Sequence, residues 1–468
     1  MDTPIIDLDA LLQAQRTAWG ARTPGYAQRM DDLARLRDAF KARLEDFARA
    51  VSADFGHRPR VETLLADGLP VLNEIDHVRK RLRRWMRTRR VAADATFLPA
   101  HCEIVMKPLG VVGIVSTWNY PVNLALVPLV DALAAGNHVL LKPSEHTPRT
   151  SALLAGMLAG VFPAERVAVV QGGTEIATAF VGLPFDHLLF TGSTAVAAKV
   201  LAAAAPNLTP VTLELGGKSP AIVAPGGVNA RNVDRIAAGK FLNAGQTCIA
   251  PDYVLVHEAE RDACVALLRA YVARHYPALP ASSDYASIVN DVHHARLIAW
   301  LDEARAAGAT VVPLAGADAA DAARRVVAPL VVLDAPEAVT LMREEVFGPV
   351  LPVVTYRDLD AAIAYVNARP RPLSLYVFDD DPARTQRVLD ACTAGSVAVN
   401  DCVFQFAQSR LPFGGIGPSG MGAYHGHAGF LAFSKQMPVF RQARWSATAW
   451  LRPPYGARAE RLLRWLLR

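Results

Sequence analysis

The chain has 468 residues, of which 52% are hydrophobic and 20% are charged, so it is long enough to build two large cores or three smaller ones. This composition excludes a disordered protein. The 49 basic and 44 acidic residues nearly balance, which argues against a nucleic-acid-binding protein. The basic run at residues 79–84 is interpreted as a solvated helix face.

The five cysteines form no CxxC pair and no even framework, which indicates a reducing compartment. Residues 1–6 lack the basic segment and apolar core of a secretory signal, and no apolar run is long enough to cross a bilayer. We therefore expect a cytoplasmic protein. The last eight residues place leucines on one face of a short helix and arginines on the other. Contact with a membrane surface and packing on a neighbouring subunit are the alternatives for this tail, and its shortness disfavours the membrane.

The first 85 residues have a helical pattern. Leu33, Leu36, Phe40, Leu44 and Phe47 recur three and four residues apart, with charged residues between them. This part is expected to be scaffold. Residues 101–106 then alternate in the way that a strand does, and they are predicted to lie in an extended arm.

Short apolar strands separated by helical segments follow from residue 109 onward. They are predicted at 139–142, 167–170 and 188–190, and in a second run at 253–256, 331–333, 351–354, 375–378 and 396–400. Such strands are typical of parallel sheets that are covered on both faces, so the chain is predicted to be an α/β protein with two domains and a cleft between them. Lys142, Thr191 and Glu214 fall at strand carboxyl ends, where such sheets bind ligands.

Three residues carry candidate chemistry. Cys248 lies in the stretch FLNAGQTCIA at residues 241–250, where it is either a nucleophile or a packed core thiol. Glu214 ends an apolar strand before two glycines, so it is either a general base for water or a partner of Lys218. Asn119, in WNYP, is either an amide donor to a developing oxyanion or a turn asparagine.

Together the motifs WNYP, FTGS, LELGGK and GQTC resemble those of the aldehyde dehydrogenase superfamily, and the resemblance covers nearly the whole chain. It implies a Rossmann-like cofactor domain, an α/β catalytic domain and a small β oligomerisation arm, in a protein that forms a homodimer. The implied ranges are 1–90 and 108–213 for the NAD(P)-binding domain, 214–400 for the catalytic domain, 91–107 and 425–442 for the arm, and 443–468 for the tail.

The resemblance also implies roles for individual residues. Cys248 would be the nucleophile, Asn119 and the Cys248 backbone N–H would hold the oxyanion, and Glu214 would activate the water that hydrolyses a thioester. Cofactor contacts would come from Lys142 and Glu145 at the adenine ribose, Gly192 and Ser193 at the pyrophosphate, Glu345 at the nicotinamide ribose, and Phe347 near the nicotinamide ring. A carboxylate at Glu145 favours NAD, with NADP as the alternative. No metal site is expected.

The stretch at residues 411–426, with residues 55–58 and WNYP, resembles the class 3 group, and most closely its bacterial coniferyl aldehyde dehydrogenases. The implied substrate is an apolar or aromatic aldehyde, with coniferyl aldehyde favoured and medium- or long-chain aliphatic aldehydes as the alternative. Ala197 stands where the family has glycine, and Gln405, which is expected to line or brace the substrate mouth, stands where relatives have histidine. His425 is interpreted as a residue that fixes a loop near the subunit contact. An acylating enzyme that uses coenzyme A is disfavoured by Glu214, and a catalytically inactive structural relative is the remaining alternative.

Overall fold

The first part of the chain is helical, as predicted. The structure is a computed structural model that describes residues 7–316 and 319–467, so the segment at residues 1–6 and Arg468 lie outside the described residues. The helices are α1 (Leu8–Ala21), α2 (Tyr26–Ala42), α3 (Leu44–Phe55), α4 (Arg60–Thr63), a π-helical turn (Leu64–Gly68) and α5 (Leu69–Trp85). Leu33, Leu36, Phe40 and Phe47 are buried, which confirms the predicted apolar face.

A six-stranded sheet forms the first α/β unit, in the order β15-β7-β6-β3-β4-β5. Its strands are β3 (Val111–Val115), β4 (His138–Lys142), β5 (Val167–Val169), β6 (His187–Thr191), β7 (Val211–Glu214) and β15 (Gly420–Met421). All neighbouring strands are parallel except β15, which runs antiparallel to β7. The accompanying helices are α6 (Asn123–Ala135), α7 (Pro148–Val161), α8 (Thr174–Val181) and α9 (Thr194–Ala204). The predicted parallel sheet is confirmed, and Lys142, Thr191 and Glu214 end their strands at one edge.

A seven-stranded sheet forms the second α/β unit, in the order β10-β11-β12-β9-β8-β13-β14. Its strands are β8 (Pro220–Val223), β9 (Tyr253–His257), β10 (Thr310–Pro313), β11 (Leu330–Leu333), β12 (Val350–Tyr356), β13 (Ser374–Phe378) and β14 (Ser396–Val399). The helices of this part are α10 (Ala230–Phe241), α11 (Arg261–His275), α12 (Asp291–Ala306), α13 (Thr340–Arg343), α14 (Leu359–Asn367) and α15 (Pro382–Ala391). All pairs are parallel except β10 with β11, as expected for strands joined by helices.

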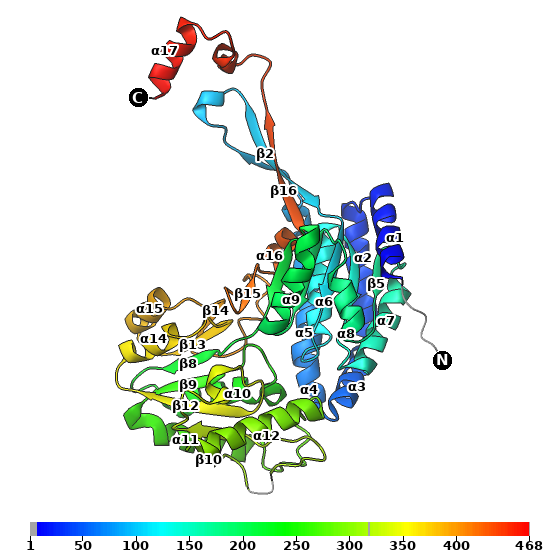
Figure 1. Cartoon of the computed structure of the whole chain (residues 1–468). Helices are drawn as coiled ribbons and strands as arrows, with labels where there is room; N and C mark the ends of the chain where they lie inside the picture. The colour runs from blue at the N-terminus through cyan, green and yellow to red at the C-terminus, as the bar shows by residue number, and fades with distance from the viewer. Residues whose placement is uncertain (1–6, 317–318, 468) are drawn as a thin grey trace.

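A narrow arm projects from the body of the molecule (Figure 1). It is a three-stranded antiparallel sheet of β1 (Arg89–Val91), β2 (His101–Pro108) and β16 (Ser434–Arg441). The helix before the return strand, α16 (Gly426–Ala432), packs against α5 and α6 on the body. The α/β fold with a β arm that the sequence predicts is therefore present, and the predicted domain boundaries stay a prediction.

Beyond the arm, the chain ends in a 3-10 turn (Ala447–Leu451) and α17 (Ala457–Leu466). This tail lies beyond the tip of the arm, away from the two sheets (Figure 1). Its aromatic side chains are open to solvent, with Trp445 81% and Trp465 71% exposed. Membrane contact and subunit packing both stay predictions for this tail.

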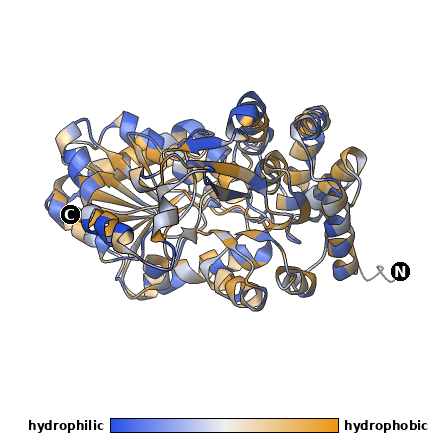
Figure 2. Cartoon of the chain, turned by 90° about the horizontal axis from the view of Figure 1, so that it is seen from above, coloured by the Kyte–Doolittle hydropathy of each residue, from blue (hydrophilic) through white to orange (hydrophobic). Residues whose placement is uncertain are grey.

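The strands inside both α/β units are mostly hydrophobic, and hydrophilic residues are found mainly on the surrounding helices (Figure 2). The most buried helix is α6, in which every residue is buried. It is too short for a bilayer, and among the described residues no helix combines the length and the apolar character that a membrane span needs. Because α6 is packed into the core along its whole length, the segment that leads into it is held in place, and this segment contains Asn119.

Candidate active site

The predicted nucleophile lies in a tightly bonded loop. Helix α10 ends at Phe241 and a 3-10 turn (Leu242–Gly245) follows, in which Asn243 and Ala244 have positive φ values of 52° and 50°. Gln246 holds this loop from inside: its side-chain N–H groups donate to the carbonyl oxygens of Asn243 (3.0 Å) and Ser287 (3.1 Å), and its Oε1 accepts from Val289 N (3.0 Å). Cys248 follows at once and is half-buried. The loop therefore presents its thiol in a fixed position.

Gln246→Ala is expected to lower the free energy of unfolding by about 2–4 kcal/mol, because it leaves the Ser287 carbonyl and the Val289 N–H buried without the partners that the glutamine provides. Urea unfolding followed by fluorescence measures this change. Gln386→Ala, which removes an exposed glutamine that bonds only to Asp390, is the matched control and should change stability by less than about 0.5 kcal/mol. Equal stability of the two variants would contradict the bracing role.

Asn119 is directed at the nucleophile loop. Its side-chain Nδ2 donates to Gln246 O (3.2 Å), and its backbone oxygen accepts from Asn243 Nδ2 (3.1 Å). An amide nitrogen carries two N–H donors, so this contact leaves one free. Both contacts reach more than 120 residues along the chain. Asn119 lies in a bend, and its side chain bonds to the distant nucleophile loop; its role as an oxyanion donor stays a prediction.

A buried ion pair supports Asn119, and the sequence analysis missed it. Arg58 Nη1 lies 3.1 Å from Asp67 Oδ2 with both side chains buried, and it also donates to Asn119 O (3.1 Å). The Arg58 guanidinium lies over the Tyr120 ring at 4.7 Å, and the Tyr120 hydroxyl bonds to Thr247 Oγ1 (2.6 Å). The only signal in the sequence was Arg58 within residues 55–58, which carried a family resemblance without a stated role.

Glu214 has the surroundings of a base that is held out of water. It ends β7 with 3% of its surface exposed, and neither carboxylate oxygen has a hydrogen-bond partner in the described structure. Burial raises the pKa of Glu214 well above its ordinary value. Lys218 instead pairs with Asp252, with Nζ to Oδ2 at 2.5 Å. The alternative that Glu214 is simply the partner of Lys218 is therefore wrong.

Cys248 shares its surroundings with two carboxylates. Burial raises the pKa of the Cys248 thiol, and Glu345 and Glu214 raise it further through their negative charge. Both carboxylates therefore act on the Cys248 thiol electrostatically, and we treat the three residues as the candidate site. A raised pKa favours the protonated thiol, so a reaction at this sulfur needs a group that removes the proton.

Glu345 and Phe347 lie in the loop after α13. Lys218 Nζ fixes this loop by donating to the carbonyls of Leu341 (2.9 Å) and Glu344 (3.0 Å). Glu345 Oε1 is buried without a partner, and burial raises the pKa of Glu345 to about 8. Phe347 has a φ of 49° and meets the Trp118 ring edge-on, with the ring centroids 5.3 Å apart.

The remaining predicted cofactor residues lie at the carboxyl edge of the six-stranded sheet. Lys142 Nζ donates to Pro143 O (2.9 Å) and reaches Glu145 Oε2 (3.4 Å). Ser193 caps α9, and its Oγ accepts from Val196 N (3.4 Å). The first turn of α9 is exposed to solvent, and its apolar residue Val196 has an exposed fraction of 45%.

These residues fit a dinucleotide. The exposed N-terminus of α9 suits a pyrophosphate, since its first N–H groups have no partner within the helix. Gly192 joins β6 to this helix and donates its N–H to Glu214 O (3.0 Å). The unpartnered oxygen of Glu345 suits a ribose hydroxyl. The structure thus groups the predicted cofactor residues around the same sheet edge as Cys248 and Glu214.

Ala197 and Gln405, the two residues that depart from the family pattern, have different surroundings. Ala197 is a residue of α9 whose side chain is buried in the apolar cluster beneath that helix, with 2% of its surface exposed. Gln405 Nε2 donates to the Tyr376 hydroxyl (3.2 Å), and that hydroxyl donates to Ile249 O. Gln405 therefore braces the residue that follows the nucleophile.

His425 is buried inside the body of the molecule. Its backbone N–H donates to Asp131 Oδ2 (3.3 Å), and its ring stacks on Phe413 with the centroids 5.5 Å apart. These contacts fix the loop as the sequence analysis expected. Whether the loop lies near a subunit contact stays a prediction.

The chain is similar to known proteins over nearly its whole length. The model of the aldehyde dehydrogenase family matches residues 8–439. A probable coniferyl aldehyde dehydrogenase of Pseudomonas aeruginosa is 47% identical over 460 residues, which cover 98% of this chain and 96% of the relative. A coniferyl aldehyde dehydrogenase of a Pseudomonas species is 44% identical, with coverage of 93% and 91%. The structure of a substrate-bound state of Staphylococcus aureus AldH superposes with a TM-score of 0.92 at 35% identity, and both chains are covered completely.

Proposed function

Because this chain belongs to the aldehyde dehydrogenase family and is an oxidoreductase, we propose that it oxidises an apolar or aromatic aldehyde, coniferyl aldehyde first, to the carboxylic acid. The observation that carries the proposal is the grouping of Cys248, Glu214 and Asn119 around one fixed loop. The mechanism and the substrate below are parts of this proposal.

The Cys248 sulfur attacks the aldehyde carbon, and the thiol proton passes to a base in the site. Asn119 Nδ2 and the Cys248 backbone N–H donate to the resulting oxyanion. When bound, NAD supplies the ring carbon that accepts the hydride. The thioester left on Cys248 is hydrolysed by a water that loses its proton to Glu214. The acid leaves and the thiol is restored.

The cofactor is NAD(P), with NAD favoured. Lys142 and Glu145 lie together just beyond β4, where the adenine ribose of a bound dinucleotide would reach. A carboxylate there favours a free 2′-hydroxyl over a 2′-phosphate, because two negative groups would repel. Ala197 lies on the buried face of α9, the helix that would face the pyrophosphate, and comparison with the Ala197→Gly variant measures its effect on cofactor affinity.

The substrate class rests on the two named relatives, and a panel of aldehydes tests it. Coniferyl aldehyde is expected to give a higher kcat/KM for NADH formation than benzaldehyde or octanal, by about tenfold or more, if contacts to its ring and hydroxyl are built into the pocket. Octanal as the best substrate would favour the aliphatic alternative. Absence of NADH from every aldehyde, with NAD and with NADP, would contradict the activity and favour the inactive relative. Coenzyme A in the assay, with the product separated by chromatography, tests the acylating alternative.

Asn119→Ala is expected to lower kcat by about 10²–10³-fold, because it removes one of two donors to the oxyanion. Steady-state NADH formation measures the change. Asn243→Ala is the informative comparison, since Asn243 lies in the same hydrogen-bond cluster but offers its side chain to Asn119 O and Gln246 O. If both variants lost activity only through a rise in KM, Asn119 would bind substrate without stabilising the transition state.

The assembly that we propose is a homodimer joined through the arm. The tip of the arm and α17 extend from the body (Figure 1). Their aromatic side chains Phe97, Phe440 and Trp465 are exposed, as on a surface that is covered in an assembly. Light scattering after size-exclusion chromatography should give twice the monomer mass, and removal of residues 443–468 shows whether the tail contributes.

A further inference from the structure

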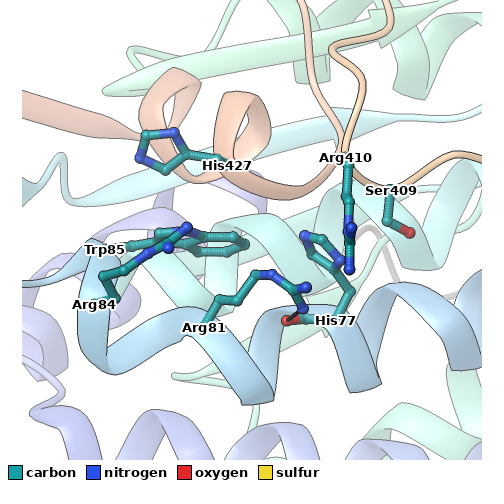
Figure 3. A pocket seen from close by; sticks show the side chains of 7 residues that line it. All are labelled: His77, Arg81, Arg84, Trp85, Ser409, Arg410 and His427. Carbon is teal, nitrogen blue, oxygen red and sulfur yellow. Dashed lines mark hydrogen bonds between the residues drawn. The ribbon is translucent and has the colours of Figure 1, made fainter.

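A separate hollow of about 380 Å³ opens where the end of α5 meets α16 and the loop at residues 409–410. Arg81 and Arg84 enter it from α5, and Arg410 enters from the loop (Figure 3). Figure 3 shows the guanidinium groups of Arg81 and Arg410 both directed toward His77. Part of the basic run at residues 79–84 therefore lines a hollow and is not only a solvated helix face.

The positive charge in this hollow has no compensating acid. In residues 7–316 and 319–467, no salt bridge joins Arg81, Arg84 or Arg410 to a carboxylate. Asp76, one residue before His77, is bound to Arg37 instead (2.7 Å). Like charges that converge without a counter-ion repel one another, so the hollow favours an anion.

The second nearby acid, Glu74, is also engaged elsewhere. Its Oε1 accepts from Gly426 N (2.7 Å), and its carboxyl group also bonds to Ser409 and to Asp131. Burial, followed by the charges of Arg81 and Arg410, lowers the pKa of His77 to about 4, so this ring is neutral at pH 7. The charge that an anion would meet therefore comes from the arginines.

The hollow is also bordered by the indole of Trp85, which exposes 5% of its surface. The Trp85 indole lies between the rings of His77 and His427, at centroid distances of 5.7 and 5.4 Å. The volume falls in the range of sites for small organic ligands, roughly 300–1,000 Å³, and exceeds what an inorganic anion alone needs. A ligand that fills the hollow therefore has a charged end and a small organic part.

We propose that this hollow binds a small phosphomonoester, with its phosphate on Arg81 and Arg410 and its organic part along Trp85. Guanidinium groups bind phosphate oxygens in a bidentate manner. Three arginines match a dianion better than the single charge of a carboxylate, which favours phosphate. Inorganic phosphate offers the same charged group without the organic part, so it serves as the comparison.

Calorimetric titration of the full-length protein with phenyl phosphate and with inorganic phosphate tests the proposal. Ionic strength is held constant, and NAD is kept saturating so that its own phosphate site is filled. Phenyl phosphate is expected to bind, and more tightly than inorganic phosphate. Arg81→Ala and Arg410→Ala should each weaken it about tenfold or more, since each removes a charge-assisted pair. Arg83→Ala is the matched control, because Arg83 is exposed on the same helix outside the hollow, and it should change the affinity less than twofold.

Three results would overturn the proposal. The first is no binding of either probe by the wild-type protein up to about 10 mM, the edge of measurable affinity. The second is equal weakening by Arg83→Ala, which would mean that diffuse positive charge attracts the anion. The third is equal affinity for the two probes, which would mean that the organic part of the ligand contributes nothing to binding. Arg81→Lys and Arg410→Lys keep the charge and the fold, so a loss of affinity in these variants supports bidentate binding even if an alanine variant is unstable.

Discussion

Cys248→Ser is expected to lower kcat for NADH formation by at least about 10³-fold with every aldehyde of the panel. A serine hydroxyl is a far weaker nucleophile than a thiolate. The charged groups that act on residue 248 in the described structure are the carboxylates of Glu345 and Glu214, which disfavour an alkoxide. Hydride transfer from the aldehyde needs the tetrahedral adduct, so the loss falls on kcat. Stopped-flow and steady-state measurements of NADH give both the first turnover and the later ones.

Cys102→Ser is the matched control for this variant. Cys102 is half-buried like Cys248 but lies on β2 of the arm, so its loss should leave kcat within about twofold. Mass spectrometry of the wild-type protein quenched during turnover should show the acyl group on the peptide that contains Cys248. Retention of full activity by the serine variant, or an acyl group on another cysteine, would remove Cys248 from the mechanism.

The sheets could be predicted from the sequence because their signal is local. Runs such as residues 139–141 and 188–190 are continuously apolar, and a polar residue, Lys142 or Thr191, follows each of them at the ligand edge. Lys142, Thr191 and Glu214 could be placed together on that ground alone, since parallel strands bring their carboxyl ends to one side. The role of each side chain needed the motif resemblance, because one polar residue after a strand does not specify a chemistry.

The support of the site could not be predicted, because it depends on contacts between distant residues. In the sequence, Gln246 stands out only as part of the GQTC motif. In the structure its side chain joins the nucleophile loop to Ser287, 41 residues away. Arg58 reaches Asn119 over 61 residues, and Tyr376 reaches Ile249 over 127. No periodicity links such pairs. Buried polar groups must find partners, but the sequence does not show which partner each one takes.

Glu214→Gln is expected to release about one NADH per active site in a fast burst and then to turn over about 10²–10⁴-fold more slowly than the wild type. Glutamine has the shape of glutamate but cannot take a proton from water, so the thioester on Cys248 forms and is not hydrolysed. Both Glu214 oxygens lack protein partners, so the substitution breaks no hydrogen bond of the fold. Stopped-flow absorbance at the NADH band measures the burst and the steady rate together.

The pH dependence separates this role from a structural one. Burial raises the pKa of Glu214, so its basic form becomes populated only as the pH rises. The steady rate of the wild type should therefore increase with pH through that raised pKa, and the glutamine variant should lose this limb. Hydroxylamine, which attacks thioesters without a base, should restore NADH turnover in the variant. A variant with no burst would place Glu214 before hydride transfer. A variant with the wild-type pH profile would assign the water to another base, for which Glu345, with a pKa raised to about 8, is a candidate.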